Sequence, residues 1–563
     1  MARDRGWRSY STSGLVLAAS MFLVSTSPSL LPRTWYYQGL VSGICAATGY
    51  GLGVLLASVA RGAARLLELR MSIGSTAGQV LRRAAYLVGT VTVVAITTLN
   101  VRAQARTASL VGMRPPGPAD WPRAVAVAVG LAALLVGLAR LLRWLTQRVA
   151  AVVGNVLPRT VASVVATLVV ATVVLWVGNN VVFRESLEAA AHLADRVNAT
   201  PPAGRSAPTS PLRSGSPQSL ESWSSLGFQG QLFVTSGPTP AQISAATGRP
   251  AMEPIRVYAG LAGARSSAST RSIAATAAAV VAELHRTGAF DRKVLAVITT
   301  TGTGWVDDWT AQSIEYLSDG DSAIAAMQYS YLPSGLAFLA DLNSPAQAGK
   351  ALFDAVYAAW SVLPPDHRPL LVVGGESLGS YGGQAAFSSV SDMLSRAQGG
   401  VWVGTPHFTP LAQELTASRN PGSPEIAPVV DAGRHIRFAT RPQDLTTDYY
   451  GRPFGTWQYP RFVYAQHPSD PVVWWDTSLA FAQPDWLREP RGQDVNEDVA
   501  WIPIVTFWQL TMDLPIAVDA PSGHGHHYDA ELVPEWAAVL GQSPTADYSA
   551  IIRAMSRTVT PMQ

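Results

Sequence analysis

Five long apolar runs in the first third of the chain limit its possible folds more than any other feature. Each run is about as long as an α-helix must be to cross a bilayer. Buried helices of a soluble bundle are the alternative, but residues 1–183 contain only three acidic residues, which favours membrane helices. The sequence therefore predicts a transmembrane helical domain over residues 1–183 with about five spans. The expected spans are Gly14–Leu31, Gly39–Ala60, Ala84–Val101, Arg123–Leu142 and Thr160–Phe183.

Charge is divided unevenly along the chain. Residues 1–183 hold 17 Arg, no Lys and three acids, a net charge of +14, whereas the remainder holds 24 Lys and Arg against 35 Asp and Glu, a net of −11. Because the basic part is also the apolar part, a lipid bilayer is a better partner than nucleic acid. The single cysteine, Cys45, lies in an apolar run, which excludes an intramolecular disulfide and a cysteine-based metal site.

The arginines between the apolar runs predict an orientation. With five spans, 12 arginines fall on one side of the membrane and five on the other, and the positive-inside bias places the larger group in the cytoplasm. The C-terminal domain is then expected outside the cytoplasmic membrane. The larger group comprises Arg3, Arg5, Arg8, Arg61, Arg65, Arg70, Arg82, Arg83, Arg140, Arg143, Arg148 and Arg159, and the smaller comprises Arg33, Arg102, Arg106, Arg114 and Arg123.

The composition changes after the last apolar run. Residues 184–225 are rich in Ser and Pro, which is typical of a linker, and residues 226–563 form the predicted folded domain. From Glu253 onward, short apolar runs alternate with helical patterns, which indicates an α/β domain with a mostly parallel sheet covered by helices. The expected strands are 255–259, 294–299, 323–331, 370–374, 400–404, 436–439 and 462–466, and the expected helices are 273–287, 308–317, 346–360, 382–395 and 503–511.

The stretch Leu371–Gly383, LVVGGESLGSYGG, contains a G-x-S-x-G motif between a predicted strand and a predicted helix. That order is typical of a nucleophile elbow, in which a strained turn exposes a serine hydroxyl. Gly375 and Gly379 would let strand and helix approach closely, which makes Ser377 the candidate nucleophile. An ordinary glycine-rich turn is the alternative. Glu376 is expected to pack or hydrogen-bond at the turn rather than to act as an acid.

A serine nucleophile needs a base to accept its proton and a carboxylate to orient that base. Among nine histidines, those of Gly523-His-Gly-His-His-Tyr528 lie where the hydrolase order of Ser, acid and His places the base. His526 is the first candidate and His524 the second. A metal cluster formed by these histidines and Asp529, or solvated loop histidines, are the alternatives.

The candidate acid follows the predicted strand Phe462–Gln466. Asp470 lies just past the end of that strand, at the edge where α/β sites assemble, although it could instead cap a helix ahead of Pro471. Asp444 and Asp448 are the spare candidates.

The oxyanion hole is expected to use the backbone N–H of Leu378 and that of Thr301 or Gly302. These last two belong to the glycine-rich loop after the strand 294–299, for which a plain connection is the alternative. Aromatic residues could line an apolar acyl pocket, although core packing accounts for most of them. They are Trp457, Tyr459, Trp474, Trp475, Trp501 and Trp508.

Together, four stretches resemble a family of actinobacterial membrane proteins, the alpha/beta-hydrolase family 9 type, which couples a multi-span N-terminal region to a C-terminal hydrolase domain. The stretches are SPSLLPRTW (27–35), GESLGSYGG (375–383), QHPSDPVVWW (466–475) and GHGHHY (523–528). The resemblance implies a hydrolase fold and a Ser-Asp-His site, and no settled substrate.

Two functions follow as expectations. The first is a membrane-anchored serine hydrolase of the esterase or lipase kind, which cleaves a carboxylic ester through an acyl-enzyme and needs no metal or organic cofactor. A lipid-like ester is expected because the enzyme is anchored beside lipid. Thioester or amide cleavage, or acyl transfer, would use the same residues. The second is an envelope scaffold or binding protein whose hydrolase-like domain has no activity. The sequence gives no oligomeric state.

Overall fold

The computed structural model describes residues 10–67, 75–263 and 266–559. Their contacts divide the chain into two compact units. Unit 1 comprises residues 1–182 and 475–521, and unit 2 comprises residues 183–474 and 522–563. The segment 475–521, which separates Asp470 from His526 in the sequence, therefore belongs to the unit that contains the N-terminal helices.

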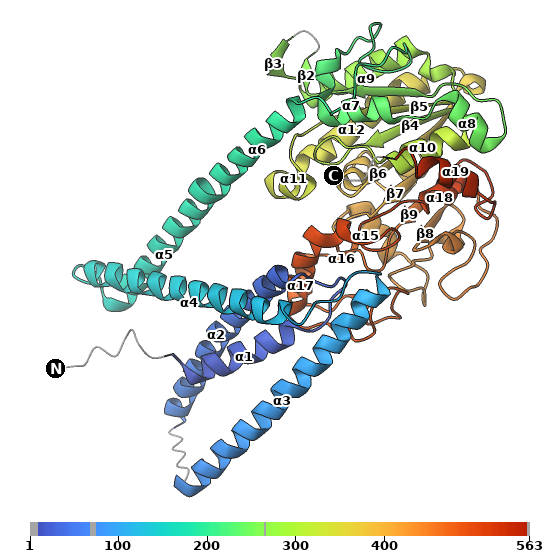
Figure 1. The fold of residues 1–563 in the computed structure, drawn as a ribbon. Coiled ribbons are helices and arrows are strands. Elements are labelled where there is room, and N and C mark those ends of the chain that lie inside the picture. The colour runs from blue at the N-terminus through green and yellow to red at the C-terminus, as the bar shows by residue number, and fades with distance from the viewer. Residues whose placement is uncertain (1–9, 68–74, 264–265, 560–563) are drawn as a thin grey trace. The chain divides into compact units, whose positions relative to one another are not determined.

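Long apolar helices form most of unit 1 (Figure 1). Among the described residues, four helices are long and apolar enough to cross a membrane, which indicates membrane association: Trp35–Leu66, Arg83–Leu110, Asp120–Val153 and Arg159–Ala199. Arg3, Arg5, Arg8 and Arg70 of the predicted orientation lie outside the described residues. The helices of this unit are α1 (Thr12–Ser25), α2 (Trp35–Leu66), α3 (Ser75–Leu110), α4 (Asp120–Val153), α5 (Arg159–Val177) and α17 (Val505–Asp513).

The first predicted span differs from the structure. Instead of a helix over Gly14–Leu31, α1 has 14 residues and ends at Ser25, so it is about 21 Å long and shorter than the roughly 30 Å hydrocarbon core. Prolines 28 and 32 explain this, because proline restricts the preceding residue and cannot donate a helical hydrogen bond. Four full-length candidates therefore replace the predicted five, with α1 as a shorter fifth segment.

The segment after α1 packs inside unit 1. The side chain of Leu31 is buried with Val111 and Ile516, and Arg33 forms a buried ion pair with Asp513, at 3.2 Å between Nη1 and Oδ1. The insertion 475–521 is thus held to the N-terminal helices by apolar contacts and by a buried charge pair.

A seven-stranded parallel sheet organises unit 2, with strand order β1-β5-β4-β6-β7-β9-β8. The predicted α/β class is confirmed. Alternate residues of each central strand enter the two cores: in β4, Ala296 and Ile298 face one core and Leu295 and Val297 the other. The strands are β1 (Ile255–Ala259), β4 (Val294–Thr299), β5 (Ser322–Met327), β6 (Leu370–Glu376), β7 (Gly399–Val403), β8 (Ile436–Ala439) and β9 (Arg461–Ala465), and a separate hairpin is formed by β2 (Ala262–Gly263) and β3 (Ser266–Thr270).

Helices cover both faces of the sheet. One face packs against α7, α8, α10, α18 and α19, and the other against α9, α12, α14 and α15. The helix predicted over 382–395 is two helices, α13 and α14, separated by residues 385–389. The helices of this unit are α6 (Arg184–Ala199), α7 (Gly227–Ser236), α8 (Pro240–Thr247), α9 (Ile273–Thr287), α10 (Asp308–Leu317), α11 (Ser334–Ala340), α12 (Asn343–Ser361), α13 (Leu378–Gln384), α14 (Val390–Arg396), α15 (Pro410–Ala417), α16 (Pro471–Trp474), α18 (Leu532–Val539) and α19 (Ser549–Met555).

Residues 184–225 have more order than a Ser/Pro-rich linker would have. They begin with α6, and the loop that follows is fixed to Glu283 of α9. Glu283 accepts hydrogen bonds from the hydroxyls of Ser214 and Ser219, each at 2.8 Å, and from the backbone N–H of Leu220 at 2.7 Å. These serines therefore attach the loop to the α/β unit.

Candidate active site

Ser377 lies in the turn between β6 and α13, at the C-terminal edge of the sheet. Its backbone has φ +54° and ψ −122°, a conformation that costs a non-glycine residue about 1–3 kcal/mol. Two hydrogen bonds hold the turn: the Ser377 N–H donates to the carbonyl of Val403 at 3.0 Å, and its carbonyl accepts from the N–H of Tyr381 at 3.1 Å. Both neighbours of Ser377 are buried, whereas Ser377 is partly exposed.

The glycines of the elbow stand where the backbone leaves no room for a Cβ. A Cβ on Gly375 would lie 2.5 Å from the carbonyl carbon of Gly379. A Cβ on Gly379 would clash with the carbonyl oxygen of Thr299 at the end of β4. These two contacts explain the G-x-S-x-G spacing, since β6, α13 and β4 meet through bare backbone.

The structure brings His526 and Asp470 into direct contact. His526 Nδ1 lies 2.6 Å from Asp470 Oδ2, and both residues are buried, at 4% and 0% exposure. The other oxygen, Oδ1, accepts the N–H of Val472 at 2.8 Å. Oδ2 also accepts the hydroxyl of Tyr528 at 2.9 Å. The carboxylate is therefore fixed on both oxygens, which holds the imidazole by its Nδ1 side.

Residues that the sequence did not single out hold the acid segment and the base segment together. His467 stacks on the ring of Tyr528, with centroids 4.0 Å apart, and its ring nitrogens lie 2.9 Å from the carbonyl oxygen of Gly525 and 3.1 Å from Glu531 Oε1. The Ser469 hydroxyl accepts the N–H of Gly525 at 2.9 Å. Polar residues are concentrated in both motifs, which was the available signal, but only the fold pairs them.

The second ring nitrogen of His526 faces Glu376. Within the described part of the chain, Nε2 is buried without a hydrogen-bond partner, and no hydrogen bond joins it to Ser377. It lies 4.0 Å from Glu376 Oε1, and both carboxyl oxygens of Glu376 are likewise buried without partners. Burial, aided by the nearby acid Asp307, raises the pKa of Glu376 well above its usual value.

The predicted oxyanion donors differ in their availability. The N–H of Thr301 donates to the carbonyl of Trp305 at 3.1 Å. The N–H of Gly302 faces the Ser334 hydroxyl at a long 3.4 Å, and Leu378 is the first residue of α13. Because the first N–H groups of a helix have no intrahelical acceptor, Leu378 supplies a donor beside Ser377.

The alternative site residues have other partners. His527 Nε2 lies 3.4 Å from Asp529, and His524 is connected to His527 by a backbone hydrogen bond in the same turn. Asp444 accepts from the Thr440 hydroxyl at 2.6 Å, and Asp448 pairs with Arg452 at 2.6 Å. Over the ranges that the structure describes, no group of three or more His, Cys, Asp or Glu side chains is arranged to hold a metal ion.

The aromatic residues predicted for an acyl pocket are divided between the units. Trp475, Trp501 and Trp508 belong to unit 1, whereas Trp457 and Trp474 are buried in unit 2 and donate their ring N–H to the carbonyls of His435 and His467. A different aromatic group lies one turn from Ser377. The ring centroid of Phe408 is 5.3 Å from that of Tyr381 and 5.1 Å from that of Phe338.

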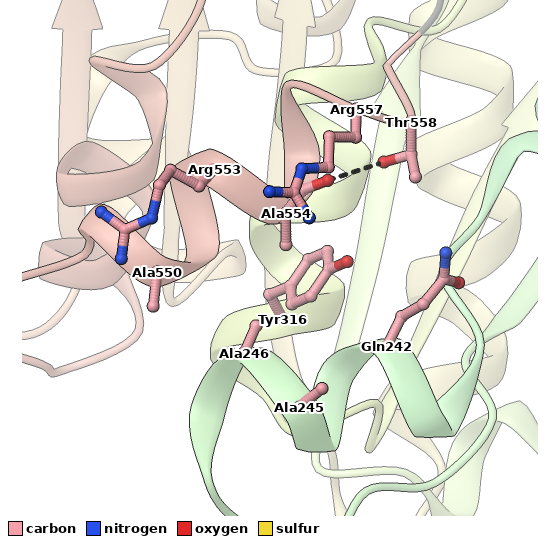
Figure 2. A pocket seen from close by; sticks show the side chains of 9 residues that line it. All are labelled: Gln242, Ala245, Ala246, Tyr316, Ala550, Arg553, Ala554, Arg557 and Thr558. Atoms are coloured by element: carbon pink, nitrogen blue, oxygen red, sulfur yellow. Dashed lines mark hydrogen bonds between the residues drawn. The ribbon is translucent and has the colours of Figure 1, made fainter.

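A separate pocket of about 320 Å³ lies between α8, α10 and α19 (Figure 2). The residues that line it are Gln242, Ala245, Ala246, Tyr316, Ala550, Arg553, Ala554, Arg557 and Thr558. Burial raises the pKa of Tyr316 to about 12, so its hydroxyl is a neutral donor. The residues that line this pocket offer hydrogen-bond donors but no pair of nucleophile and base.

Comparison with protein families agrees with this geometry. Residues 255–550 match the model described as "Alpha/beta-hydrolase family", and residues 26–238 match the model of that family's N-terminus. The chain belongs to the alpha/beta-hydrolase family. No curated protein and no solved structure matches it. The family matches together extend over both units of this hydrolase-family protein and include the insertion 475–521.

Proposed function

We propose that this protein is a membrane-anchored serine hydrolase that cleaves a carboxylic ester through an acyl-enzyme intermediate. The observation that carries the proposal is the buried 2.6 Å contact between His526 Nδ1 and Asp470 Oδ2, at the same sheet edge as the strained turn of Ser377. These residues come from loops after β6 and β9 and from the segment before α18. The carboxyl ends of parallel strands are where α/β sites assemble.

Each of the three residues has a defined role in the proposed reaction. The Ser377 hydroxyl attacks the ester carbonyl carbon while His526 Nε2 takes its proton, and Asp470 stabilises the imidazolium through Nδ1–H. The imidazolium then gives that proton to the leaving alkoxide, which leaves an acyl group on Ser377. Water, deprotonated by Nε2, then attacks the acyl carbon. The imidazolium returns this proton to Ser377 Oγ as the bond to the acyl group breaks, which releases the carboxylic acid and restores the free serine.

The oxyanion is proposed to be stabilised by the Leu378 N–H and by an N–H of the loop after β4. Gly302 is preferred to Thr301 there, because the Thr301 N–H already donates to Trp305 and the Gly302 contact with Ser334 is long enough to exchange. Losing one such donor typically costs about 10²–10³ in kcat.

A lipid-like acyl group is proposed on two grounds. Long apolar helices precede the α/β unit, and the aromatic group of Phe338, Tyr381 and Phe408 lies one turn from Ser377. All three side chains are partly exposed, so an apolar chain could cover them. A series of p-nitrophenyl esters of increasing chain length tests this, with longer acyl chains expected to lower KM and Phe408→Ala expected to remove that dependence.

Labelling with a fluorophosphonate probe tests the serine hydrolase proposal. The full-length chain in detergent should be modified at Ser377, as located by mass spectrometry, and Ser377→Ala should abolish labelling. Ser380→Ala is the matched control, because that hydroxyl lies one turn on in the same helix but is buried against Thr405 at 2.7 Å. His526→Gln should reduce the labelling rate by about 10³-fold or more, whereas His524→Gln should leave it near wild type.

The non-catalytic scaffold is the competing proposal. Complete absence of label on a folded wild-type chain would favour it, and would leave the His526–Asp470 pair as a structural remnant. Equal loss in the two histidine variants would instead contradict the choice of His526 as the base.

The catalytic unit is proposed to lie on the extracytoplasmic side of the cell membrane. The sequence places 12 arginines on one side of the predicted spans and five on the other. The reversal of the chain between α1 and α2 preserves this grouping even though α1 is short: Gly14 packs near Tyr50, and the Ser25 hydroxyl donates to Ser42 at 2.8 Å, so the two helices are antiparallel. Protease treatment of right-side-out vesicles should cleave the α/β unit; cleavage only after lysis would reverse the assignment.

A further inference from the structure

The proposed reaction does not use Glu376, the residue directly before the nucleophile. Glu376 ends β6, is 4% exposed, and has two carboxyl oxygens without partners among the described residues. A buried carboxyl group without partners is costly, so its presence needs a reason. The Nε2 of His526 lies 4.0 Å from the Oε1 of Glu376.

The groups around Glu376 favour its protonated form. Asp307 acts on it from the segment before α10, Asp470 from the segment after β9, and Asp529 and Glu531 from the segment before α18. All four are acidic, and together with burial they raise the pKa of Glu376 well above its usual value. The neighbouring imidazoles of His527 and His467 are already paired with Asp529 and Glu531.

A protonated Glu376 has a hydrogen-bond donor where a neutral His526 has an acceptor. Because Nδ1–H of His526 is directed at Asp470, its Nε2 carries the lone pair, and a carboxylic acid is a strong donor to such a nitrogen. Closing the 4.0 Å gap by about 1 Å would give both buried groups a partner. That contact would occupy the lone pair that must take the proton of Ser377.

We propose that Glu376 and His526 share one proton, so that Glu376 is a positioning residue that withholds the base until this proton is lost. The proposal rests on the serine hydrolase function and on His526 as its base. The shared proton lies either on the carboxyl oxygen, which donates to Nε2, or on Nε2 beside the carboxylate. Nε2 is unavailable to Ser377 in both forms, and it becomes available when the proton leaves to solvent as pH rises.

Two groups that share one proton lose their protons in two steps that belong to the pair. In the wild type, the rise of activity with pH on the acidic side of the profile (the acidic limb) then follows the loss of the second proton from this pair. In Glu376→Gln the amide keeps the shape of the carboxyl group but cannot exchange a proton with Nε2, so the acidic limb no longer depends on a shared proton. An opposite charge within 4–6 Å of a titrating group shifts its pKa by about 1–3 units, so we expect the limb to move to lower pH by about 1 unit.

The pH dependence of fluorophosphonate labelling tests this in the full-length chain. Glu376→Gln should label Ser377 about tenfold faster than wild type at pH values below both half-maximal points, and the two rates should converge at high pH. The matched control is Glu535→Gln, since Glu535 is also a buried glutamate whose pKa burial raises, but its electrostatic neighbours are Glu531 and Asp444. That control should follow the wild-type profile.

The outcomes separate this proposal from a structural role. A Glu376 that only stabilises the fold would lower the rate of Glu376→Gln equally at every pH. Either that result or a profile that coincides with wild type would overturn the shared proton.

A second measurement does not depend on catalysis. NMR of the full-length chain labelled at histidine Cε1 would follow His526, identified by the signal lost in His526→Gln. The Cε1 chemical shift should change with pH in two steps in the wild type and in one step in Glu376→Gln. A single step in the wild type would refute the proposal even if the variant did not fold. Absence of labelling in every chain would refute the serine hydrolase function instead, and the NMR result would still decide whether Glu376 is coupled to His526.

Discussion

Substituting Gly404 tests the candidate site without replacing any of the three proposed catalytic residues. It follows β7, has φ +51°, and packs against the imidazole of His526. A Cβ at this position would clash with Cε1 of the ring and would lie 2.8 Å from Nδ1, whereas ordinary contacts begin at 3.4 Å. The Nδ1 contact alone requires the ring to move by at least about 0.6 Å in Gly404→Ala, and the closer Cε1 contact requires more. This movement either lengthens the bond to Asp470 or turns Nε2 away from Ser377.

The expected cost to activity is large compared with the cost to stability. A misplacement of about 1 Å at a reacting group can reduce the rate about 100-fold, so a movement of 0.6 Å should slow labelling of Ser377 by about 10- to 100-fold. The left-handed backbone of an alanine costs only about 1–2 kcal/mol. A drop of about 2–4 °C in Tm, followed by differential scanning fluorimetry in detergent, is the corresponding change in stability.

Gly422→Ala is the matched control. Gly422 also has a positive φ, +84°, but an added Cβ there would meet no atom within 4 Å. It should lose only the backbone contribution to stability, without the cost of displacing a buried ring, and keep the wild-type labelling rate. If Ser377 were labelled as fast in Gly404→Ala as in Gly422→Ala, the imidazole beside Gly404 would not take part in the reaction. The assignment of His526 as the base would then have to be abandoned.

Three further predictions concern the surroundings of the site and the fold. Tyr528→Phe removes the hydroxyl that donates to Asp470 and accepts the backbone N–H of His467 at 3.0 Å, so it should lower the free energy of unfolding by about 1–3 kcal/mol and slow labelling; an unchanged denaturation midpoint would show that this hydroxyl is dispensable. In unit 1, Asp513→Ala leaves the buried charge of Arg33 unpaired and should lower the free energy of unfolding by about 3–5 kcal/mol, seen as a lower Tm or as loss of folded protein. The control is the exposed Arg106–Asp498 pair, where Asp498→Ala should lower it by about 1 kcal/mol or less. Asp307 caps α10, and burial raises its pKa to about 7 from 3.8. The unfolded chain therefore releases this proton at lower pH than the folded chain, so stability is lost as pH rises between these two values. Asp307→Asn keeps a capping side chain, so its Tm should rise relative to that of the wild type from about pH 4 to 7 and stay level above 7. A difference in Tm that did not change with pH would mean that Asp307 is ionised in the folded protein.

Local sequence patterns predicted much of the α/β unit. The strands Ile255–Ala259, Val294–Thr299 and Ile436–Ala439 and the helices Ile273–Thr287 and Asp308–Leu317 have the predicted bounds. Their limits depend on nearby residues: Ser272 and Asp307 cap the two helices, and Gly288 ends the first of them in a left-handed conformation. The elbow was predictable for the same reason, because its glycines, strand and helix are consecutive in the chain.

Predictions that depended on distant contacts were less complete. The first apolar run was expected to cross the membrane, but its last third leaves the helix after Ser25 and packs with residues near the C-terminal end of the insertion. The loop after α6 was expected to be a linker, but Glu283 fixes it through serines that composition alone classes as linker residues. Neither the insertion residues that pack with the end of the first run nor Glu283 can be recognised as a partner from the sequence, because each lies tens to hundreds of residues from the segment it contacts.

The sequence by itself determined the alternation of strands and helices, the apolar helices and the glycine pattern of the elbow, since each arises from the conformational preference or hydrophobicity of neighbouring residues. Only the tertiary structure decided that 475–521 joins the N-terminal helices, that Tyr528 and His467 hold Asp470 and His526 together, and that Glu376 faces Nε2 of the imidazole. The physical reason is that burial and hydrogen-bond geometry depend on where separate strands end in space, and a parallel sheet brings together ends that the chain keeps far apart.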